Sequence, residues 1–316
     1  METAMERWRS FRHRLAVLGL VLPLIIVSCS RPAPYRRVNL TPVPQQVPTL
    51  AAAGELPALR LAVAAILSPQ RTAHDYTGLI AYLSNKLGRP LRLVQGSTYA
   101  ETNEMLRTGQ ADLGFLCTGA YVQGQRDFDM ELLVIPQVNG EIVYRSYIVV
   151  RADSPAQRLQ DLRGGVFAFT DPLSLSGYMV PLALLRADGE TASSFFDRTL
   201  FTYSHDKSIQ AVANGWVDGV AVDSLVYEAL VAQSSPLVER TRVIWRSEAF
   251  GAPPVVVRSD LDASTKEQLR RALLGMAEDE EGREALTSLG VDRFVPADDR
   301  LYDSARAWLR ALGGTR

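Results

Sequence analysis

The chain has 316 residues, 47% of them hydrophobic, and a formal net charge of −1. This length suffices for one or two domains with buried cores, and the absence of a basic cluster in the body of the chain argues against a nucleic-acid-binding protein. Since the three His and two Cys show no metal-ligand spacing, we expect neither a metal site nor a cofactor.

The first 29 residues have the pattern of an export signal. An apolar, uncharged stretch at 15–27 is too short for a comfortable membrane span and ends in Ser28 and Cys29. The basic residues before it are Arg7, Arg9, Arg12 and Arg14. The end of the stretch is similar to a bacterial lipobox, so we expect a lipoprotein signal peptide at 1–29 and a lipid on Cys29. A plain membrane anchor and a signal without lipid are the alternatives.

Residues 30–57 are rich in proline and lack apolar periodicity, which is typical of a semi-extended linker. The second cysteine, Cys117, then has no partner for an intrachain disulfide. We interpret it as a small, inert residue.

The body of the chain alternates strand and helix signals. Expected strands cover 59–64, 90–95 and 111–116, and expected helices cover 75–87, 97–108 and a segment opening at 117–121. Thr98 and Glu101 fit a capping box, and Tyr99 beside them is expected to pack. Strands that alternate with helices favour parallel α/β units.

The second half continues this alternation. Its expected strands are 132–137, 143–151, 165–169, 200–203, 217–222, 241–247 and 253–258. Its expected helices are 159–162, 177–187, 193–198, 208–214, 225–232, 264–280 and 303–312. Residues 109–115 and 215–221 are similar to each other, and each leaves a helix and enters a strand. Two similar α/β lobes in one chain would produce this echo.

Residues 170–181 join an apolar strand to a helix through a turn that contains Ser174, Ser176 and Gly177. The first N–H groups of a helix lack internal partners and attract negative charge, and serine hydroxyls can donate to the same group. The turn therefore predicts an anion cradle. The alternative is that Ser174 or Ser176 only caps the helix.

At this turn the chain resembles a known family. Residues 171–177 are similar to the Asp-Pro-x-Ser-x-Ser-Gly segment of the periplasmic phosphate/phosphite/phosphonate-binding proteins of ABC transporters. Supporting segments in the same order are 82–88, 109–112, 150–155, 204–206, 211–215 and 243–247. The resemblance covers roughly residues 58 to 300.

The resemblance implies an α/β protein with the two-lobed type II periplasmic-binding-protein fold. Each lobe would be a mostly parallel sheet flanked by helices, and a two-strand hinge would join the lobes. The first lobe would take residues 58–146, the second lobe 147–241, and the chain would return to the first lobe with its C-terminal helices at 242–316.

The resemblance also implies which residues bind the ligand. These are Ser174, Ser176, Gly177, His205 and Asp223, with Asp206 at the position of an acidic residue beside the histidine. From the residues themselves, His205 could instead be a surface histidine and Asp223 a helix N-cap.

Two first-lobe residues, Thr118 and Ser68, follow strands and are further candidates for contact with the ligand. The chain departs from the family at Leu116, where relatives often have tyrosine, and at Leu175, where they often have threonine. Two potential hydrogen-bond donors to an oxyanion are therefore absent.

The first functional hypothesis is an exported, lipid-anchored, monomeric solute-binding protein, placed on the periplasmic or extracellular face of the membrane. It would capture a small oxyanion, deliver it to an ABC permease and catalyse nothing. The second hypothesis keeps the binding site but couples it to a membrane receptor. The third is a hydrolase using Ser176 and His205, with Asp223 completing a triad, but Ser176 lacks the Gly-x-Ser-x-Gly elbow.

Overall fold

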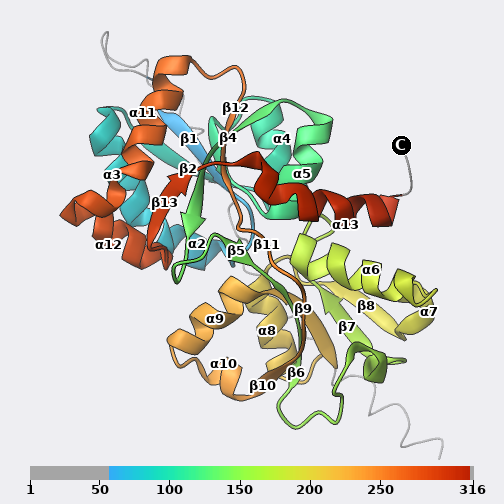
Figure 1. The fold of residues 1–316 in the computed structure, drawn as a ribbon. Helices are drawn as coiled ribbons and strands as arrows, with labels where there is room; N and C mark the ends of the chain where they lie inside the picture. The colour runs from blue at the N-terminus through green and yellow to red at the C-terminus, as the bar shows by residue number, and fades with distance from the viewer. Residues whose placement is uncertain (1–56, 314–316) are drawn as a thin grey trace, which may run out of the picture. The chain divides into compact units, whose positions relative to one another are not determined.

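A computed structural model of the chain describes residues 57–313 (Figure 1). The predicted signal peptide, Cys29 and the predicted linker up to residue 56 lie outside the described residues. Within the described part, no helix is both long enough and apolar enough to cross a membrane.

The first sheet has six strands and combines early and late parts of the chain. In spatial order they are β13 (Arg293–Pro296), β4 (Met130–Gln137), β12 (Val255–Arg258), β3 (Leu113–Phe115), β1 (Leu59–Val63) and β2 (Leu91–Gln95). Strand β1 pairs in parallel with β2 and β3, whereas β12 and β13 pair antiparallel with their neighbours.

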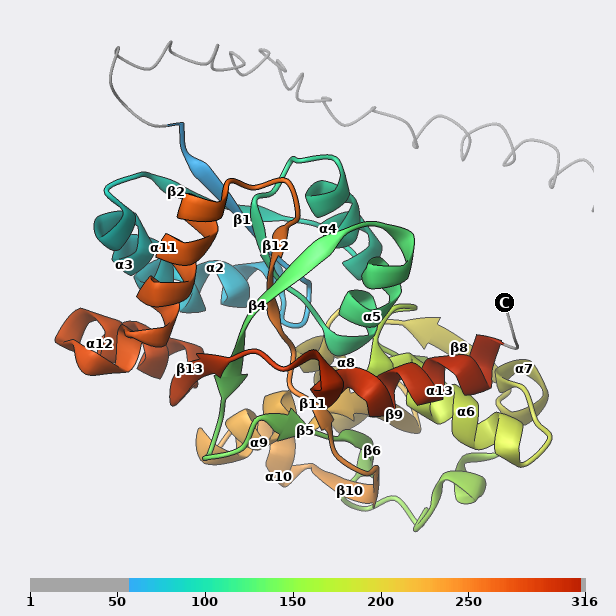
Figure 2. The ribbon, with the colours of Figure 1, turned by 45° about the horizontal axis from the view of Figure 1, so that its top comes forward.

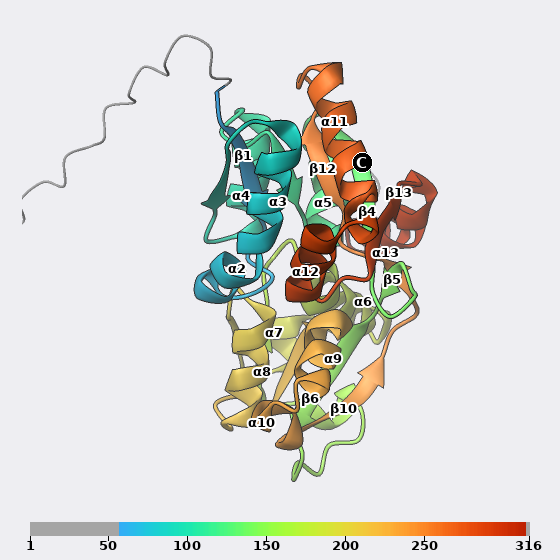
Figure 3. The ribbon, with the colours of Figure 1, turned by 90° about the vertical axis from the view of Figure 1, so that its left-hand side faces the viewer.

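Side chains alternate between the two faces of this sheet, so each face has its own core. Leu61 and Val63 belong to one core, and Ala62 between them belongs to the other. The first core is covered by α3 (Thr77–Leu87), α11 (Ala263–Leu274) and α12 (Glu280–Leu289), which group together in Figure 3. The second is covered by α4 (Tyr99–Arg107), α5 (Thr118–Asp127) and α13 (Asp303–Gly313).

The second sheet has five strands. They are β10 (Thr241–Arg246), β6 (Ser146–Arg151), β9 (Gly219–Asp223), β7 (Val166–Phe169) and β8 (Arg198–Phe201) in spatial order. One face packs on α8 (His205–Ala213), α9 (Ser224–Ala232) and α10 (Pro236–Glu239). The other packs on η2 (Leu159–Leu162), α6 (Val180–Ala187) and α7 (Ala192–Phe195).

The chain crosses between the sheets twice, and the two crossings pair with each other. Strand β5 (Val143–Tyr144) runs antiparallel to β11 (Phe250–Gly251), with Tyr144 opposite Phe250. Helix α13 packs against α5, β11 and α6, so it contacts elements of both lobes (Figures 1 and 2).

Most strands of each sheet run in one direction, as expected: β1, β2, β3 and β4 in the first sheet, and β7, β8, β9 and β10 in the second. Strands β12, β13 and β6 run the opposite way. Strand β10 still pairs with β6, so the chain returns to the first sheet after β10 and not at residue 242.

Three local expectations also differ from the structure. The expected helix 264–280 breaks at Gly275, after which α12 begins behind the N-cap Asp279. The expected loop 66–72 contains the start of α2 (Pro69–Asp75), because proline suits a first helical turn. Strand β13 carries no strong sequence signal.

Candidate functional site

The turn after β7 is a π-helical segment, η3 (Leu175–Met179), that leads into α6. Pro181 has no N–H, so it cannot bond to the carbonyl of Gly177 as a regular helix would require. That carbonyl instead accepts from the N–H of Thr170 at 3.1 Å. The expected helix 177–187 therefore starts with an irregular turn, which widens the backbone around Ser176.

The two serines of this turn have different surroundings. The Oγ of Ser174 accepts from the N–H of Gly177 at 2.9 Å, so Ser174 caps the turn, as the alternative interpretation of the sequence required. Ser176 is fully buried, and its Oγ has no partner among the described residues. The hydroxyl of Ser176 is therefore the one free to bind a ligand.

Gly177 is needed for packing. A Cβ on Gly177 would stand 2.5 Å from the Oγ1 of Thr170, which is too close for any side chain. The glycine thus brings the turn against the end of β7.

His205 opens α8 and is fully buried. Its Nδ1 accepts from the backbone N–H of Asp223 at 3.1 Å, and since a backbone N–H can only donate, the ring proton lies on Nε2. Burial lowers the pKa of His205 to about 3, against a raising effect from Asp206. The neutral ring therefore offers an Nε2–H donor, which has no partner among the described residues.

Asp223 ends β9 and caps α9, since its Oδ1 accepts from the N–H of Leu225 at 2.7 Å. Burial raises the pKa of Asp223 to about 7, while the N–H groups of Leu225 and Val226 oppose this shift. At neutral pH this carboxyl group can therefore accept a proton from an acidic ligand or keep its own.

Two tyrosines complete the group, and sequence reasoning assigned neither of them to the site. Tyr99 opens α4, Tyr144 lies on the crossing strand β5, and both are buried with hydroxyls that lack a partner among the described residues. Burial raises the pKa of each phenol, and Asp223 raises both further. The hydroxyl of Ser176 acts on the pKa of Tyr144 in the opposite direction, so these groups are neighbours.

Thr118 and Ser68, the two first-lobe residues predicted to contact the ligand, make hydrogen bonds to other parts of the protein. The hydroxyl of Thr118 is buried beside Tyr144, but it donates to the carbonyl of Gly251 at 2.8 Å. Ser68 is half-buried, and its N–H donates to the carboxylate oxygens of Asp206 at 3.1 and 3.2 Å. Burial raises the pKa of the Cys117 thiol to about 11, which agrees with an inert residue.

The two lobes meet directly around this group. The N–H of His205 donates to the carbonyl of Ile66 at 2.9 Å, and the N–H of Tyr99 donates to Asp171 at 3.1 Å. Each of these bonds joins an element of one sheet to an element of the other. The lobes are therefore closed over the candidate site.

The arrangement suits binding better than catalysis. Nδ1 of His205 accepts from a backbone N–H, so this nitrogen carries no proton that it could donate to the Asp223 carboxylate. The hydroxyl of Ser176 makes no hydrogen bond to the imidazole ring. A Ser-His-Asp triad is therefore not assembled. Within residues 57–313, no cluster of His, Cys, Asp or Glu could hold a metal ion.

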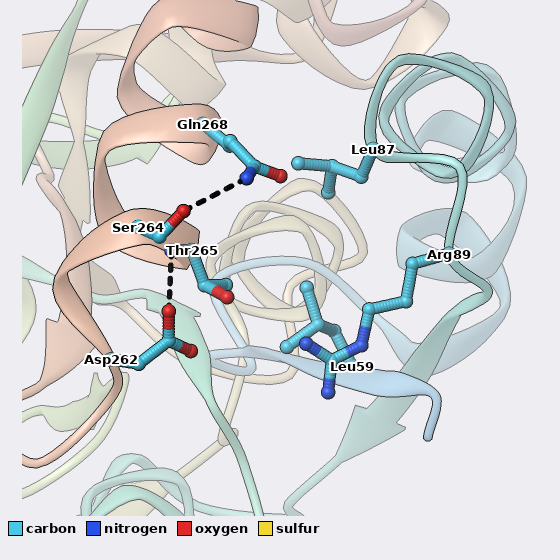
Figure 4. A pocket seen from close by; sticks show the side chains of 7 residues that line it. All are labelled: Leu59, Leu87, Arg89, Asp262, Ser264, Thr265 and Gln268. Atoms are coloured by element: carbon cyan, nitrogen blue, oxygen red, sulfur yellow. Dashed lines mark hydrogen bonds between the residues drawn. The ribbon is translucent and has the colours of Figure 1, made fainter. Parts of the chain in front are cut away.

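A separate pocket of about 260 Å³ lies on the first lobe (Figure 4). Its polar groups already bond to each other: Asp262 accepts from the N–H of Thr265 at 2.8 Å, and Gln268 donates to Ser264 at 3.1 Å. None of the expected site residues lines it.

Comparisons with known proteins agree with a two-lobed binding protein. A family model described as "ABC transporter, phosphonate, periplasmic substrate-binding protein" matches residues 61–302. The phosphate-import protein PhnD of Mycolicibacterium smegmatis is 30% identical over 207 residues, covering 62% of this chain and 64% of that protein, which is less than two thirds of its length. The phosphonates-binding periplasmic protein of Escherichia coli is 24% identical over 247 residues, covering 77% of this chain and 73% of that protein.

A solved structure has a similar fold. The binding protein component of a phosphonate ABC transporter from Pseudomonas aeruginosa superposes with a TM-score of 0.76 at 23% identity, covering 81% of this chain and 86% of that chain. The expected two-lobed type II fold is confirmed. The relatives are substrate-binding proteins and not enzymes, in agreement with the expectation that the chain catalyses nothing.

Proposed function

We propose that this chain, which belongs to the family of periplasmic substrate-binding proteins of phosphonate ABC transporters, captures a small phosphorus oxyanion between its lobes and delivers it to a membrane permease. One observation carries the proposal. The Oγ of Ser176, the hydroxyls of Tyr99 and Tyr144 and the Nε2–H of His205 are buried donors with no partner among the described residues. Leaving a buried donor unpaired costs about 1–3 kcal/mol, so such a group calls for an acceptor.

Charge favours a phosphorus oxyanion over sulfate. The donors are neutral, and the acidic group beside them, Asp223, has a pKa near 7. A phosphonate, phosphite or phosphate ion that keeps a proton can donate it to Asp223. Sulfate has no proton to donate at neutral pH, so it would meet the carboxylate as a repelling charge.

Closure would trap the ligand. The hydrogen bonds from His205 to Ile66 and from Tyr99 to Asp171 join residues of the two lobes next to the proposed site. The paired strands β5 and β11 form the connection about which the lobes would move. Tyr144 on β5 would then link the ligand to the hinge.

Export and anchoring are part of the proposal. Residues 1–29 would direct export, Cys29 would carry the lipid, and the linker would hold a monomeric binding protein away from the bilayer. Cells expressing the wild-type chain should retain it in the membrane fraction, and Cys29→Ala should move it to the soluble fraction. A wild-type chain recovered in the soluble fraction would contradict the proposed lipid anchor but not the proposed binding function.

A thermal-shift screen of the purified protein tests the binding function. We expect phosphite, methylphosphonate, aminoethylphosphonate or phosphate to raise the melting temperature by a few degrees, since a hundredfold excess over Kd stabilises the folded state by about 2.7 kcal/mol. Sulfate and amino acids should have no effect. A shift with sulfate alone, or with none of these ions, would refute the proposal.

A further inference from the structure

Asp171 is a buried acidic residue at the contact between the lobes, and it is not one of the four donors proposed to bind the anion. It comes directly after β7 and is 1% exposed. Within residues 57–313, no lysine or arginine side chain pairs with its carboxylate. Burying a carboxylate without a cation is costly unless hydrogen bonds hold the charge. Its hydrogen-bond donors therefore decide whether this carboxylate can stay buried.

Each oxygen of the carboxylate accepts from one backbone N–H. Oδ1 accepts from Leu173 at 2.8 Å, and Oδ2 accepts from Tyr99 at 3.1 Å. Burial raises the pKa of Asp171, and these two N–H groups oppose the shift. Leu173 lies in the turn that leads to the serines, whereas Tyr99 lies in the first lobe, 72 residues before Asp171. One carboxylate thus joins both halves of the proposed anion site.

Tyr99 receives this bond at a point where its own helix offers none. It is the first residue of α4, and the first N–H groups of a helix have no acceptor within the helix. The side chain of the N-cap, Thr98, accepts from the N–H of Glu101 at 3.1 Å instead. The second lobe therefore supplies the acceptor that fixes the backbone beneath the Tyr99 side chain.

On the second lobe, Asp171 also holds the turn that carries Ser176. Its carbonyl accepts from the N–H of Ser174 at 2.9 Å, and the Oγ of Ser174 accepts in turn from the N–H of Gly177 at 2.9 Å. Ser176 lies between these two residues. A short series of hydrogen bonds therefore runs from Asp171 to the turn around Ser176 on one side and to Tyr99 on the other.

We infer that Asp171 is a positioning residue that sets the hydroxyl of Tyr99 against that of Ser176 when the lobes close. The inference rests on the proposed function and deepens it, because both oxygens of Asp171 already hold N–H groups and the residue acts through Tyr99. The task requires a carboxylate. A carboxylate has two acceptor oxygens, whereas an amide has one oxygen and a donating NH2 group.

Asp171→Asn tests this role without changing the size of the side chain. The amide oxygen should keep the local bond to Leu173, so its NH2 group would face the N–H of Tyr99, donor against donor. We expect the Kd for methylphosphonate to rise at least tenfold in the purified full-length protein. The melting temperature without ligand should stay within a few degrees, because removing a buried charge offsets the lost bond.

A double-mutant cycle with Tyr99→Phe separates positioning from general support of the fold. In Tyr99→Phe the hydroxyl is gone, so Asp171→Asn has little left to misplace. It should raise the Kd by at most about threefold in that background. A purely structural role would weaken binding by the same factor in both backgrounds, and this result would overturn the inference.

The control variant is Asp218→Asn. Asp218 is exposed in the second lobe, and its Oδ2 accepts from the N–H of Val166 at 2.7 Å, at the other end of β7. One amide oxygen can keep this single bond, so the Kd should not change. A loss of affinity equal to that of Asp171→Asn would show that any such substitution in this lobe impairs binding, against the inference.

Hydrogen exchange tests the contact in the wild-type protein. The N–H of Tyr99 should exchange at least tenfold more slowly with methylphosphonate bound than without it, because open lobes leave this N–H to water. Equal exchange in the two states would overturn the inference.

The outcomes separate this inference from the function on which it rests. If the wild type binds methylphosphonate and Asp171→Asn binds it equally well, the inference is wrong and the proposed function stands. If the wild type binds no phosphorus oxyanion, the proposed function fails and the inference fails with it.

Discussion

Gly119 of the first lobe touches the backbone of Leu173 in the second lobe. A Cβ on Gly119 would stand 2.3 Å from the carbonyl oxygen of Leu173 and 2.7 Å from the N–H nitrogen of Leu175. Neither backbone atom can move aside without shifting the turn that contains Ser176. The two lobes can therefore close to this distance only because residue 119 has no side chain.

We expect Gly119→Ala to prevent full closure. The Kd for methylphosphonate should rise at least tenfold, since the bound state must then tolerate a clash with rigid backbone. The melting temperature of the protein without ligand should stay within a few degrees, because the open lobes avoid the clash. Titration and thermal melts measure the two effects.

The control for this prediction is Gly275→Ala. Gly275 has an ordinary φ of −85° and lies after α11 on the first lobe, and a Cβ there would stand 3.2 Å from the carbonyl oxygen of Arg271 in the same lobe. The Kd should therefore stay unchanged, and the melting temperature should fall slightly at most. A Gly119→Ala protein that binds as tightly as the wild type would show that binding does not require this closed form.

Ser174, the N-cap of η3, and Ser176 within η3 should separate stability from binding. Ser174→Ala removes the cap on Gly177 and should lower the free energy of unfolding by about 1 kcal/mol. Ser176→Ala removes a hydroxyl without a partner, so it should not lower this free energy, but it should weaken methylphosphonate binding at least tenfold. Chemical denaturation and titration of both variants check the contrast, and a stability loss confined to Ser176→Ala would reverse our assignment.

The tyrosine hydroxyls should matter for affinity alone. Tyr99→Phe and Tyr144→Phe each remove a buried hydroxyl without a partner, so each should weaken binding by about tenfold and leave the melting temperature equal or higher. The matched control is Tyr82→Phe, because the hydroxyl of Tyr82 bonds to Ala272 and Asp279 in the first lobe. It should lower stability slightly and leave the Kd unchanged. Equal Kd values for all three variants would exclude the two phenols from the site.

Asp223 should make the protein without ligand less stable as the pH rises. Its pKa is raised from 3.8 to about 7, so between these values the folded state holds a proton that the unfolded state has lost. The free energy of unfolding therefore falls through this window and levels off above pH 7. Asp223→Asn stays neutral and can still cap α9.

We therefore expect Asp223→Asn to be more stable than the wild type at pH 8, by an amount on the order of 1–4 kcal/mol, and equally stable near pH 4. His205 has a lowered pKa and the opposite pH slope, but it is present in both proteins and cancels in the difference. Denaturation of both proteins at pH 4, 6 and 8 measures this difference. A difference that does not change with pH would contradict a buried, titrating Asp223.

Much of the fold and part of the site could be predicted from sequence. The strand, hydroxyl-rich turn and helix around Ser176 follow from local signals, and so does the end of β9 near Asp223. The expected helix 208–214 misses the start of α8, which begins at His205. Local signals also predict a helix cap at this turn. They do not show which serine hydroxyl accepts the hydrogen bond from a backbone N–H.

The remaining features depend on contacts between distant parts of the chain. Tyr144 reaches the site only because β5 pairs with β11, about a hundred residues later, and Tyr99 only because the lobes close. Ser68 was expected in the site because it follows a strand. In the structure the N–H of Ser68 donates to the carboxylate of Asp206, and no local sequence pattern reveals this contact between the lobes.

The central claim concerns which atoms bind the anion, and a crystal structure of the protein with methylphosphonate tests it most directly. We predict phosphonate oxygens within about 3.2 Å of the Oγ of Ser176, the Nε2 of His205 and the hydroxyls of Tyr99 and Tyr144. A phosphonate bound elsewhere, or one that leaves these four atoms without contact, would contradict the account.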